Sequence, residues 1–166
     1  MPNEKPFDRI TLSRNTSVYN LLEEQHKMVY RTIKGIIGHE ETTADLVQEV
    51  FLKAVSRFET SQNFVPWLRS IAVRTAIDHL RRAKPIELPD TLPMADQDLD
   101  QRIMVEQTLA HLEPQDRAIL NLIVGQQLSY QEVADTLQIP PGTVGSRLHH
   151  ARQSFKHYWS KLWPEE

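Results

Sequence analysis

Polar side chains near the C-terminus have the residue types that read DNA. They recur on one face of the segment that follows Pro141. Thr143 stands at the start of this segment, and the polar residues after it are Ser146, Arg147, His149, His150, Arg152, Gln153 and Lys156. Arginine and histidine hydrogen-bond to base edges, and cationic arginine also binds phosphates. No Asp or Glu occurs from Thr143 to Pro164. The pattern predicts a DNA-contacting helix, although a solvated face of an ordinary helical bundle has the same periodicity.

A patch of opposite charge is predicted near residue 45. The outward face of a strongly periodic helix presents Asp45, Gln48, Glu49 and Leu52 together. An acidic helix face is most often simply solvated. An exposed leucine among carboxylates is also how a helix docks on a basic partner.

Residues 63–82 combine aromatic rings with arginines. Phe64 lies at the edge of the polar break 59–63, where its ring can stack on an unpaired base. Core packing is the alternative for Phe64, and it is what we expect for Trp67. Arg74, Asp78 and Arg81 share one face, and the first two are spaced as an ion pair. The basic side chains near this end are Arg69, Arg81, Arg82 and Lys84.

Catalytic and metal chemistry have no recognisable centre in the sequence. The chain has no cysteine, which excludes disulfides and thiolate metal ligands. It shows no Ser/His/Asp set, paired carboxylates or glycine-rich phosphate loop. We therefore expect neither an enzyme nor a cofactor, and no small-molecule substrate. His150 and His157 share a helix face, but zinc needs further ligands nearby.

Two helices with a sharp break must position the C-terminal polar face. Ser129 and Glu132 have the spacing of a capping box. The inward residues of this first helix are Tyr130, Val133, Ala134 and Leu137. Pro140-Pro141-Gly142 stops it, and Thr143 is expected to cap the second helix. The second helix has an apolar stripe of Val144, Leu148, Ala151, Phe155, Tyr158 and Leu162. This arrangement predicts a helix-turn-helix, which places its second helix in the DNA major groove.

The remaining pattern predicts an all-α fold of two small helical domains. In the first, one helix runs from Ser17 to Gly38, the next is capped by Thr42 with Asp45, and the third holds Pro66 in its first turn. The second adds a helix near 100–112 and one opened by Pro114. Between the domains, Lys84 to Asp98 contains three prolines and four acidic residues, which predicts a flexible acidic linker. The predicted units are a flexible arm 1–16, a first domain 17–83, the linker 84–99 and a second domain 100–166.

Composition limits the setting in which the protein works. A chain of 166 residues with 40% hydrophobic residues suits one soluble domain or two small ones. The sequence shows no signal peptide and no membrane-spanning segment, so we expect it in the cytoplasm. Its net charge of −3 is unexpected for a protein that binds DNA alone. Either the DNA prediction is wrong, or a partner supplies most of the affinity.

Together these segments resemble a bacterial extracytoplasmic-function sigma factor over roughly residues 19–157. D-L-V-Q-E-V-F (45–51) is similar to the helix that grips the clamp of RNA polymerase. W-L-R-S-I-A (67–72) with A-I-D-H-L-R-R (76–82) is similar to the helix that opens the promoter. L-S-Y-Q-E-V-A (128–134) and P-G-T-V-G-S-R-L-H-H-A-R (141–152) are similar to the reader of the upstream promoter.

The resemblance implies partners and roles for these residues. The patch around Asp45 would bind the β′ clamp of core polymerase, and the second domain would bind the β flap. Asn63 and Phe64 would capture a flipped non-template base. Arg74, Arg81 and Arg82 would hold the separated strand, and Asp78 would belong to the same promoter-melting set. The implied partners are core RNA polymerase, promoter DNA and an anti-sigma factor, soluble or membrane-anchored.

The chain departs from the family pattern at several positions. Gly145 and His150 stand where the family often has a basic residue, and Arg74 stands where it often has asparagine. Gln138 stands where a glycine often closes the first helix of the helix-turn-helix. Two alternatives stay open: a decoy that occupies an anti-sigma factor without binding DNA, and a plain helix-turn-helix repressor.

Overall fold

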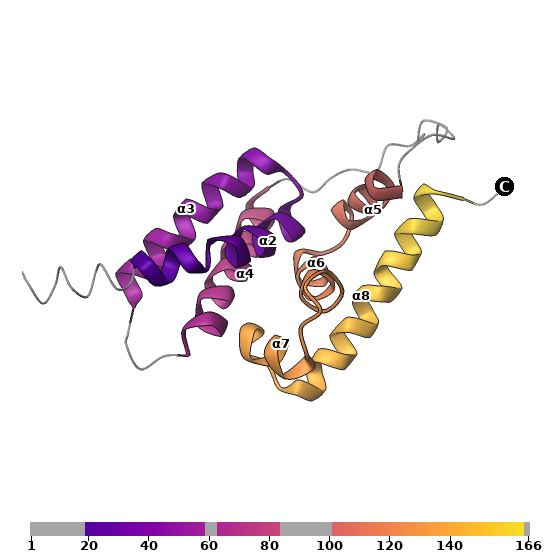
Figure 1. The fold of residues 1–166 in the computed structure, drawn as a ribbon. Coiled ribbons are helices and arrows are strands. Elements are labelled where there is room, and N and C mark those ends of the chain that lie inside the picture. The colour runs from indigo at the N-terminus through magenta and orange to yellow at the C-terminus, as the bar shows by residue number, and fades with distance from the viewer. Residues whose placement is uncertain (1–18, 59–62, 84–100, 165–166) are drawn as a thin grey trace, which may run out of the picture.

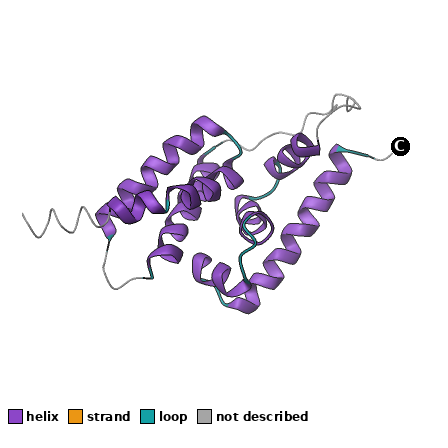
Figure 2. Ribbon diagram, in the orientation of Figure 1, coloured by secondary structure: helices purple, strands orange, loops and turns teal. Residues whose placement is uncertain are grey.

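The computed structural model describes residues 19–58, 63–83 and 101–164, and every regular element in these ranges is helical (Figures 1 and 2). The all-α prediction is therefore confirmed. The predicted arm and linker lie outside the described residues. None of the described helices is long and apolar enough to cross a membrane.

Three helices form the first group: α2 (His26–Ile37), α3 (Glu40–Arg57) and α4 (Phe64–Arg82). Helical residues 19–24 precede them, so the single helix predicted up to Gly38 is wrong, because a turn at Gln25 interrupts it. The Gln25 N–H is shared between the carbonyls of Leu21 and Leu22, which tightens the chain there. Gly38 does end α2, with a left-handed φ of 84°.

The start of α3 differs from the prediction. The helix begins at Glu40 after His39, so Thr42 does not cap it and the capping box with Asp45 is wrong. The Thr43 hydroxyl instead donates to the His39 carbonyl at 2.6 Å. Glu40 and Glu41 lie in the first turn, where their charges complement the helix dipole.

The second group contains α5 (Gln101–Ala110), α6 (Pro114–Leu120), a π-helix η1 (Asn121–Gly125), α7 (Tyr130–Leu137) and α8 (Pro141–Leu162). Pro114 opens α6, as its missing N–H favours. Arg117 ties α5 to α6 by donating to the carbonyls of Leu112 and Ala110. Burial lowers the pKa of Arg117, and nearby Glu113 partly opposes this shift.

Helix α7 starts with the predicted capping box. The Glu132 N–H donates to the Ser129 hydroxyl at 3.2 Å, and the Ser129 N–H donates to the Glu132 carboxylate at 2.8 Å. These bonds to the Ser129 backbone and hydroxyl lower the pKa of Glu132. The cap therefore stabilises α7 fully at a pH above the ordinary pKa of a glutamate carboxyl. This contribution is lost as the pH falls through the lowered pKa that Glu132 has in the folded protein.

Helix α8 begins earlier than predicted. Pro140 is its N-cap and Pro141 its first residue, because the proline ring presets a helical φ. Thr143 therefore lies inside the first turn, and its prediction as a cap is wrong. The stripe from Val144 to Leu162 faces inward, with Val144, Leu148, Ala151 and Leu162 buried. Tyr130 was predicted inward but is 48% exposed, because its ring lies over Gly145 at the edge of the packing.

The two groups of helices share one apolar core. Helices α2 and α4 pack against α6, and they also contact η1 and α7 respectively. Figure 1 shows α6 between the first group and α8, with α3 on the outer side. Buried residues from both groups, such as Ile33, Leu68, Ile119 and Val133, belong to a single cluster. Arg69 of α4 is buried as well, whereas Ile103 of α5 is 43% exposed.

Candidate functional site

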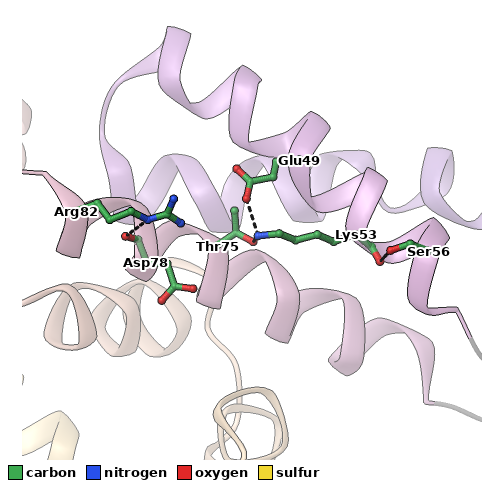
Figure 3. Close-up of polar contacts among 6 residues, drawn as sticks. All are labelled: Glu49, Lys53, Ser56, Thr75, Asp78 and Arg82. Atoms are coloured by element: carbon green, nitrogen blue, oxygen red, sulfur yellow. Dashed lines mark hydrogen bonds and ion pairs between the residues drawn. The ribbon is translucent and has the colours of Figure 1, made fainter.

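The acidic patch lies on the outer side of α3. Asp45 and Gln48 are exposed, and Leu52 is 74% exposed. Glu49 is half-buried and pairs with Lys53 at 2.6 Å, while Lys53 also donates to Thr75 on α4 at 3.1 Å (Figure 3). The structure thus brings all four predicted residues onto one surface. Glu49 is held in place there, whereas Asp45 makes no ion pair within the described part of the chain.

The start of α4 carries Asn63 and Phe64. Asn63 is exposed and makes no side-chain cap bond, so its amide faces solvent. The Phe64 ring is half-buried, with its centroid 5.7 Å from that of Phe58 and 5.9 Å from that of Trp67. Phe64 therefore packs in an aromatic cluster and still keeps an exposed part, so packing and base stacking are both open to it.

The polar face of α4 is arranged differently from the prediction. The prediction of an ion pair between Arg74 and Asp78 is wrong, because Arg74 donates instead to the side chain of Gln138 at the end of α7. The Asp78 carbonyl accepts a bond from Arg82 at 3.2 Å (Figure 3). Arg81 and Arg82 are exposed at the end of the helix. Sequence spacing cannot reveal the Gln138 contact, because the two residues are 64 positions apart.

Helix α8 presents most of the predicted DNA-contacting residues to solvent. Thr143 is half-buried, and the exposed members are Ser146, Arg147, His149, His150, Arg152 and Gln153. The His150 Nδ1 lies 3.1 and 3.2 Å from the two carboxylate oxygens of Asp116, a buried residue of α6 that the sequence did not single out. A carboxylate partner favours the tautomer with its proton on Nδ1, which leaves Nε2 of a neutral ring as an acceptor.

One cavity joins residues that were predicted to serve separate tasks. It has a volume of about 190 Å³ and lies between α4, α6, α7 and α8. Arg74, Asp78 and Arg81 line it from α4, and Arg147 lines it from α8. The structure thus places a predicted DNA-reading arginine against the predicted promoter-melting helix. The described residues contain no group of His, Asp or Glu that could hold a metal ion.

Comparison with known proteins gives matches over both groups of helices. The family model for sigma-70 region 2 matches residues 21–86, and that for sigma-70 region 4 matches residues 102–155. The RNA polymerase sigma-H factor of Pseudomonas aeruginosa is 30% identical over 160 residues, which cover 81% of each chain. The ECF RNA polymerase sigma factor SigE of Mycolicibacterium smegmatis is 30% identical over 159 residues, and the match spans 85% of this chain but 61% of SigE.

Solved structures of similar fold cover nearly the whole chain. CnrH, solved with the cytosolic domain of CnrY, superimposes with a TM-score of 0.63 at 20% identity, over 93% of this chain and 97% of CnrH. RpoE of Bartonella quintana, solved with the anti-sigma factor NepR, gives a TM-score of 0.57 at 20% identity, over 84% of this chain and 94% of RpoE. At this identity, the two similarities support the fold.

Proposed function

This chain belongs to the sigma-70 family and is an RNA polymerase sigma factor of the extracytoplasmic-function type, and from that premise we propose how its surfaces divide the work of initiation. The observation that carries the proposal is the presence of both sigma regions in one chain, matching residues 21–86 and 102–155. A plain helix-turn-helix repressor would not need the first of these regions.

The acidic patch on α3 is proposed to bind the β′ clamp of core polymerase. Its support is the exposure of Asp45, Gln48 and Leu52 on the outer side of the fold. Carboxylates around an exposed leucine combine charge steering with apolar contact, as docking on a basic helix requires. The second domain is proposed to bind the β flap.

The start and polar face of α4 are proposed to open the promoter. Asn63 offers an exposed amide for a base edge, and Phe64 offers part of its ring for stacking. Arg81 and Arg82 are exposed on the same helix. Their positive charges can neutralise the phosphates of the separated DNA strand. Arg74 and Asp78 belong to this proposed set because they lie on the same face.

Helix α8 is proposed to read the upstream promoter element, with Arg152 on phosphate and His149 and His150 on bases. In holoenzyme, we expect Arg152→Ala to weaken binding to all promoters alike and to lower the salt slope by about 1. Replacing His149 or His150 by alanine should instead change the preference between upstream elements by about 1–3 kcal/mol, since a base contact is lost.

Competition binding of the holoenzyme to promoter variants across a salt series measures both effects. Lys161→Ala is the matched control, because Lys161 is an exposed cation at the far end of the same helix. Unchanged preference in both histidine variants would remove these side chains from base reading.

We infer that the protein acts by binding rather than by catalysis, because its family regulates transcription. We also place it in the cytoplasm, where core polymerase and chromosomal DNA are found. Promoters are then selected by the polymerase and this chain jointly, which accounts for a DNA-binding protein with a net charge of −3.

An anti-sigma factor, soluble or membrane-anchored, is proposed as the inhibitory partner. Support comes from the proteins of similar fold, since CnrH was solved with part of CnrY and RpoE with the anti-sigma factor NepR. We expect it to cover the α3 patch, the polymerase-facing surface of the second domain, or both. Affinity purification of the native protein from unstressed cells should recover a stoichiometric partner. Recovery of the protein alone would count against this proposal.

The proposed function predicts new transcription start sites in the source bacterium. Inducing this chain and mapping transcript 5′ ends should reveal starts that share an upstream element and a downstream element at fixed spacing. Induction of the Phe64→Leu variant should yield far fewer of these starts. If no start depends on the intact chain, the alternative of a decoy that never binds DNA is favoured.

A further inference from the structure

A buried carboxylate lies beneath the surface of α8 that is proposed to contact DNA. Asp116 of α6 is 7% exposed, and among the described residues its hydrogen-bond partner is His150 of α8. The Asp116 Oδ1 bonds to the His150 ring, whereas Oδ2 is buried with no hydrogen bond in the part of the chain that the structure describes. Burying a carboxylate is costly unless a partner offsets the lost hydration. The contact with His150 is therefore the feature of Asp116 that needs an explanation.

Two ordinary roles do not account for this contact. Asp116 lies in the first turn of α6, where its charge complements the helix dipole, but an exposed carboxylate would do the same without the cost of burial. The neighbouring cation, Arg117, is directed elsewhere, because its guanidinium donates to the carbonyls of Leu112 and Ala110. This leaves the imidazole of His150 as the group on which Asp116 acts.

The rest of the His150 side chain faces outward. It is 71% exposed, although its Nδ1 lies 3.1 and 3.2 Å from the two oxygens of a buried carboxylate. Ser146 precedes it by four residues and Gln153 follows it by three, so these three exposed side chains share one face of α8. Because Nδ1 is bound to Asp116, Nε2 is the ring nitrogen that remains free to contact DNA.

The bond to Asp116 determines what Nε2 can do. An ionised carboxylate has no proton to donate, so the bond between Oδ1 and the ring requires a proton on Nδ1. A neutral imidazole carries one proton, and its Nε2 is then a hydrogen-bond acceptor. A histidine without a partner on Nδ1 exchanges between its two tautomers and presents either a donor or an acceptor. The carboxylate therefore removes one of two possible readings.

We propose that Asp116 is a positioning residue that sets the base specificity of α8, because it keeps the proton of neutral His150 on Nδ1 and so makes Nε2 accept a hydrogen bond from a base that carries an exocyclic amine. In the major groove, these bases are adenine, through N6, and cytosine, through N4. Guanine presents the acceptors N7 and O6 there and cannot donate to Nε2. This inference rests on the proposed function, because that function places α8 on the upstream promoter element.

An arginine at position 150 would read DNA differently. A guanidinium has five donors and no acceptor, and its usual base partner is guanine. His150 held by Asp116 offers the opposite hydrogen-bonding character at the same place on the helix. A promoter element selected by this chain should therefore contain an amine-bearing base at the step that His150 contacts.

The tautomer of His150 can be measured in the free, full-length chain by ¹⁵N NMR of the histidine rings, at a mildly alkaline pH that keeps them neutral. Comparison with His150→Ala identifies its signals among those of the seven histidines. We expect the proton on Nδ1 in the parent protein. Asp116→Leu keeps the branched shape but has no acceptor, so it should give a mixture of tautomers. Asp135→Leu, at an exposed position on α7, is the matched control and should leave the His150 signals unchanged.

Base analogues test the reading in holoenzyme. Promoter fragments from the mapped start sites carry, at single positions of the upstream element, purine for adenine or a pyrimidinone for cytosine, which removes the exocyclic amine. At one position, we expect the parent holoenzyme to bind the amine-free fragment about twofold to tenfold more weakly, the range for one neutral hydrogen bond. His150→Ala should abolish this discrimination, Asp116→Leu should reduce it, and Asp135→Leu should retain it.

The measured quantity is the ratio of affinities for the two fragments. Loss of a negative charge at Asp116 or Asp135 strengthens binding to all DNA alike, and the analogue weakens its own base pair equally for every variant. Neither effect changes the ratio from one variant to another. A purely structural role of Asp116 would lower the stability of the variant and leave both the tautomer and the ratio as they are in the parent protein.

A proton on Nε2 of His150 in the parent protein would overturn the proposal. This measurement needs no variant, so it is decisive even if Asp116→Leu does not fold. Equal discrimination in the parent, Asp116→Leu and His150→Ala proteins would overturn it as well. If the holoenzyme selects promoters without any amine discrimination that depends on His150, this inference fails and the proposed function stands. If the tautomer is as expected but the holoenzyme binds no promoter, the proposed function fails, and the base reading fails with it.

Discussion

We expect the reversal of Asp45 and Glu49 to lysine to abolish binding to core polymerase and to leave the protein folded. The reason is the position of both carboxylates on the outer side of α3, next to an exposed Leu52. Two reversals turn attraction to a basic clamp helix into repulsion, and like charges facing each other cost several kcal/mol. Affinity for immobilised core polymerase measures the effect.

Stability should change little in this variant. Glu49→Lys removes the ion pair with Lys53 and brings two cations together, but such i,i+4 terms at partly exposed positions are only about 0.2–0.5 kcal/mol. The control is Glu23→Lys with Glu24→Lys, the same change of charge at two exposed positions outside the patch. If both double variants lose polymerase equally, net charge rather than the α3 patch governs binding.

We expect the replacement of Phe64 by leucine to lower open-complex formation and to spare the closed complex. Leucine keeps the apolar contact with Phe58 and Trp67 but cannot stack on an unpaired base. Lost stacking costs about 1–3 kcal/mol, or roughly a fivefold to 150-fold drop in the opening equilibrium. Permanganate reactivity of promoter thymines reports opening, and DNase protection reports the closed complex.

Three neighbouring variants separate stacking from packing. Phe64→Tyr retains a ring and should open promoters normally. Phe64→Ala removes both packing and stacking, and it should lose stability as well as opening. Phe58→Leu disturbs the same aromatic cluster from the end of α3 and should open promoters normally. Equal thymine reactivity in Phe64→Leu and the parent protein would assign the ring to packing alone.

The parts of the fold that could be predicted depend on local sequence. The capping box of Ser129 with Glu132, the stop at Gly38 and the start at Pro114 involve residues at most a few positions apart. The errors at Thr42 and Thr143 arose because proline or acidic residues started each helix earlier than a threonine cap would. Such boundary shifts leave the inward face unchanged, so Val144, Leu148 and Ala151 are buried as the predicted stripe requires.

The contacts between the domains could not be predicted in the same way. Spacing paired Arg74 with Asp78, whereas its partner Gln138 is 64 residues away. The burial of Arg69 and the approach of Asn121 to Gly35 likewise depend on how two distant segments pack. Two signals did exist in the sequence. Gly35 lies inside a helix with an apolar face, and Gln138 stands where a glycine commonly closes the first helix of a helix-turn-helix. Both positions lie where the two groups of helices contact each other.

In vitro transcription tests the central claim most directly. Core polymerase from the source organism, promoter fragments chosen from the mapped start sites, and this purified chain should together give transcripts of defined length. Core polymerase alone, or with the Asp45→Lys/Glu49→Lys variant, should give none. If the intact chain adds no transcript while a known sigma factor activates the same core polymerase on its own promoter, the protein does not act as a sigma factor on these promoters and the account is contradicted.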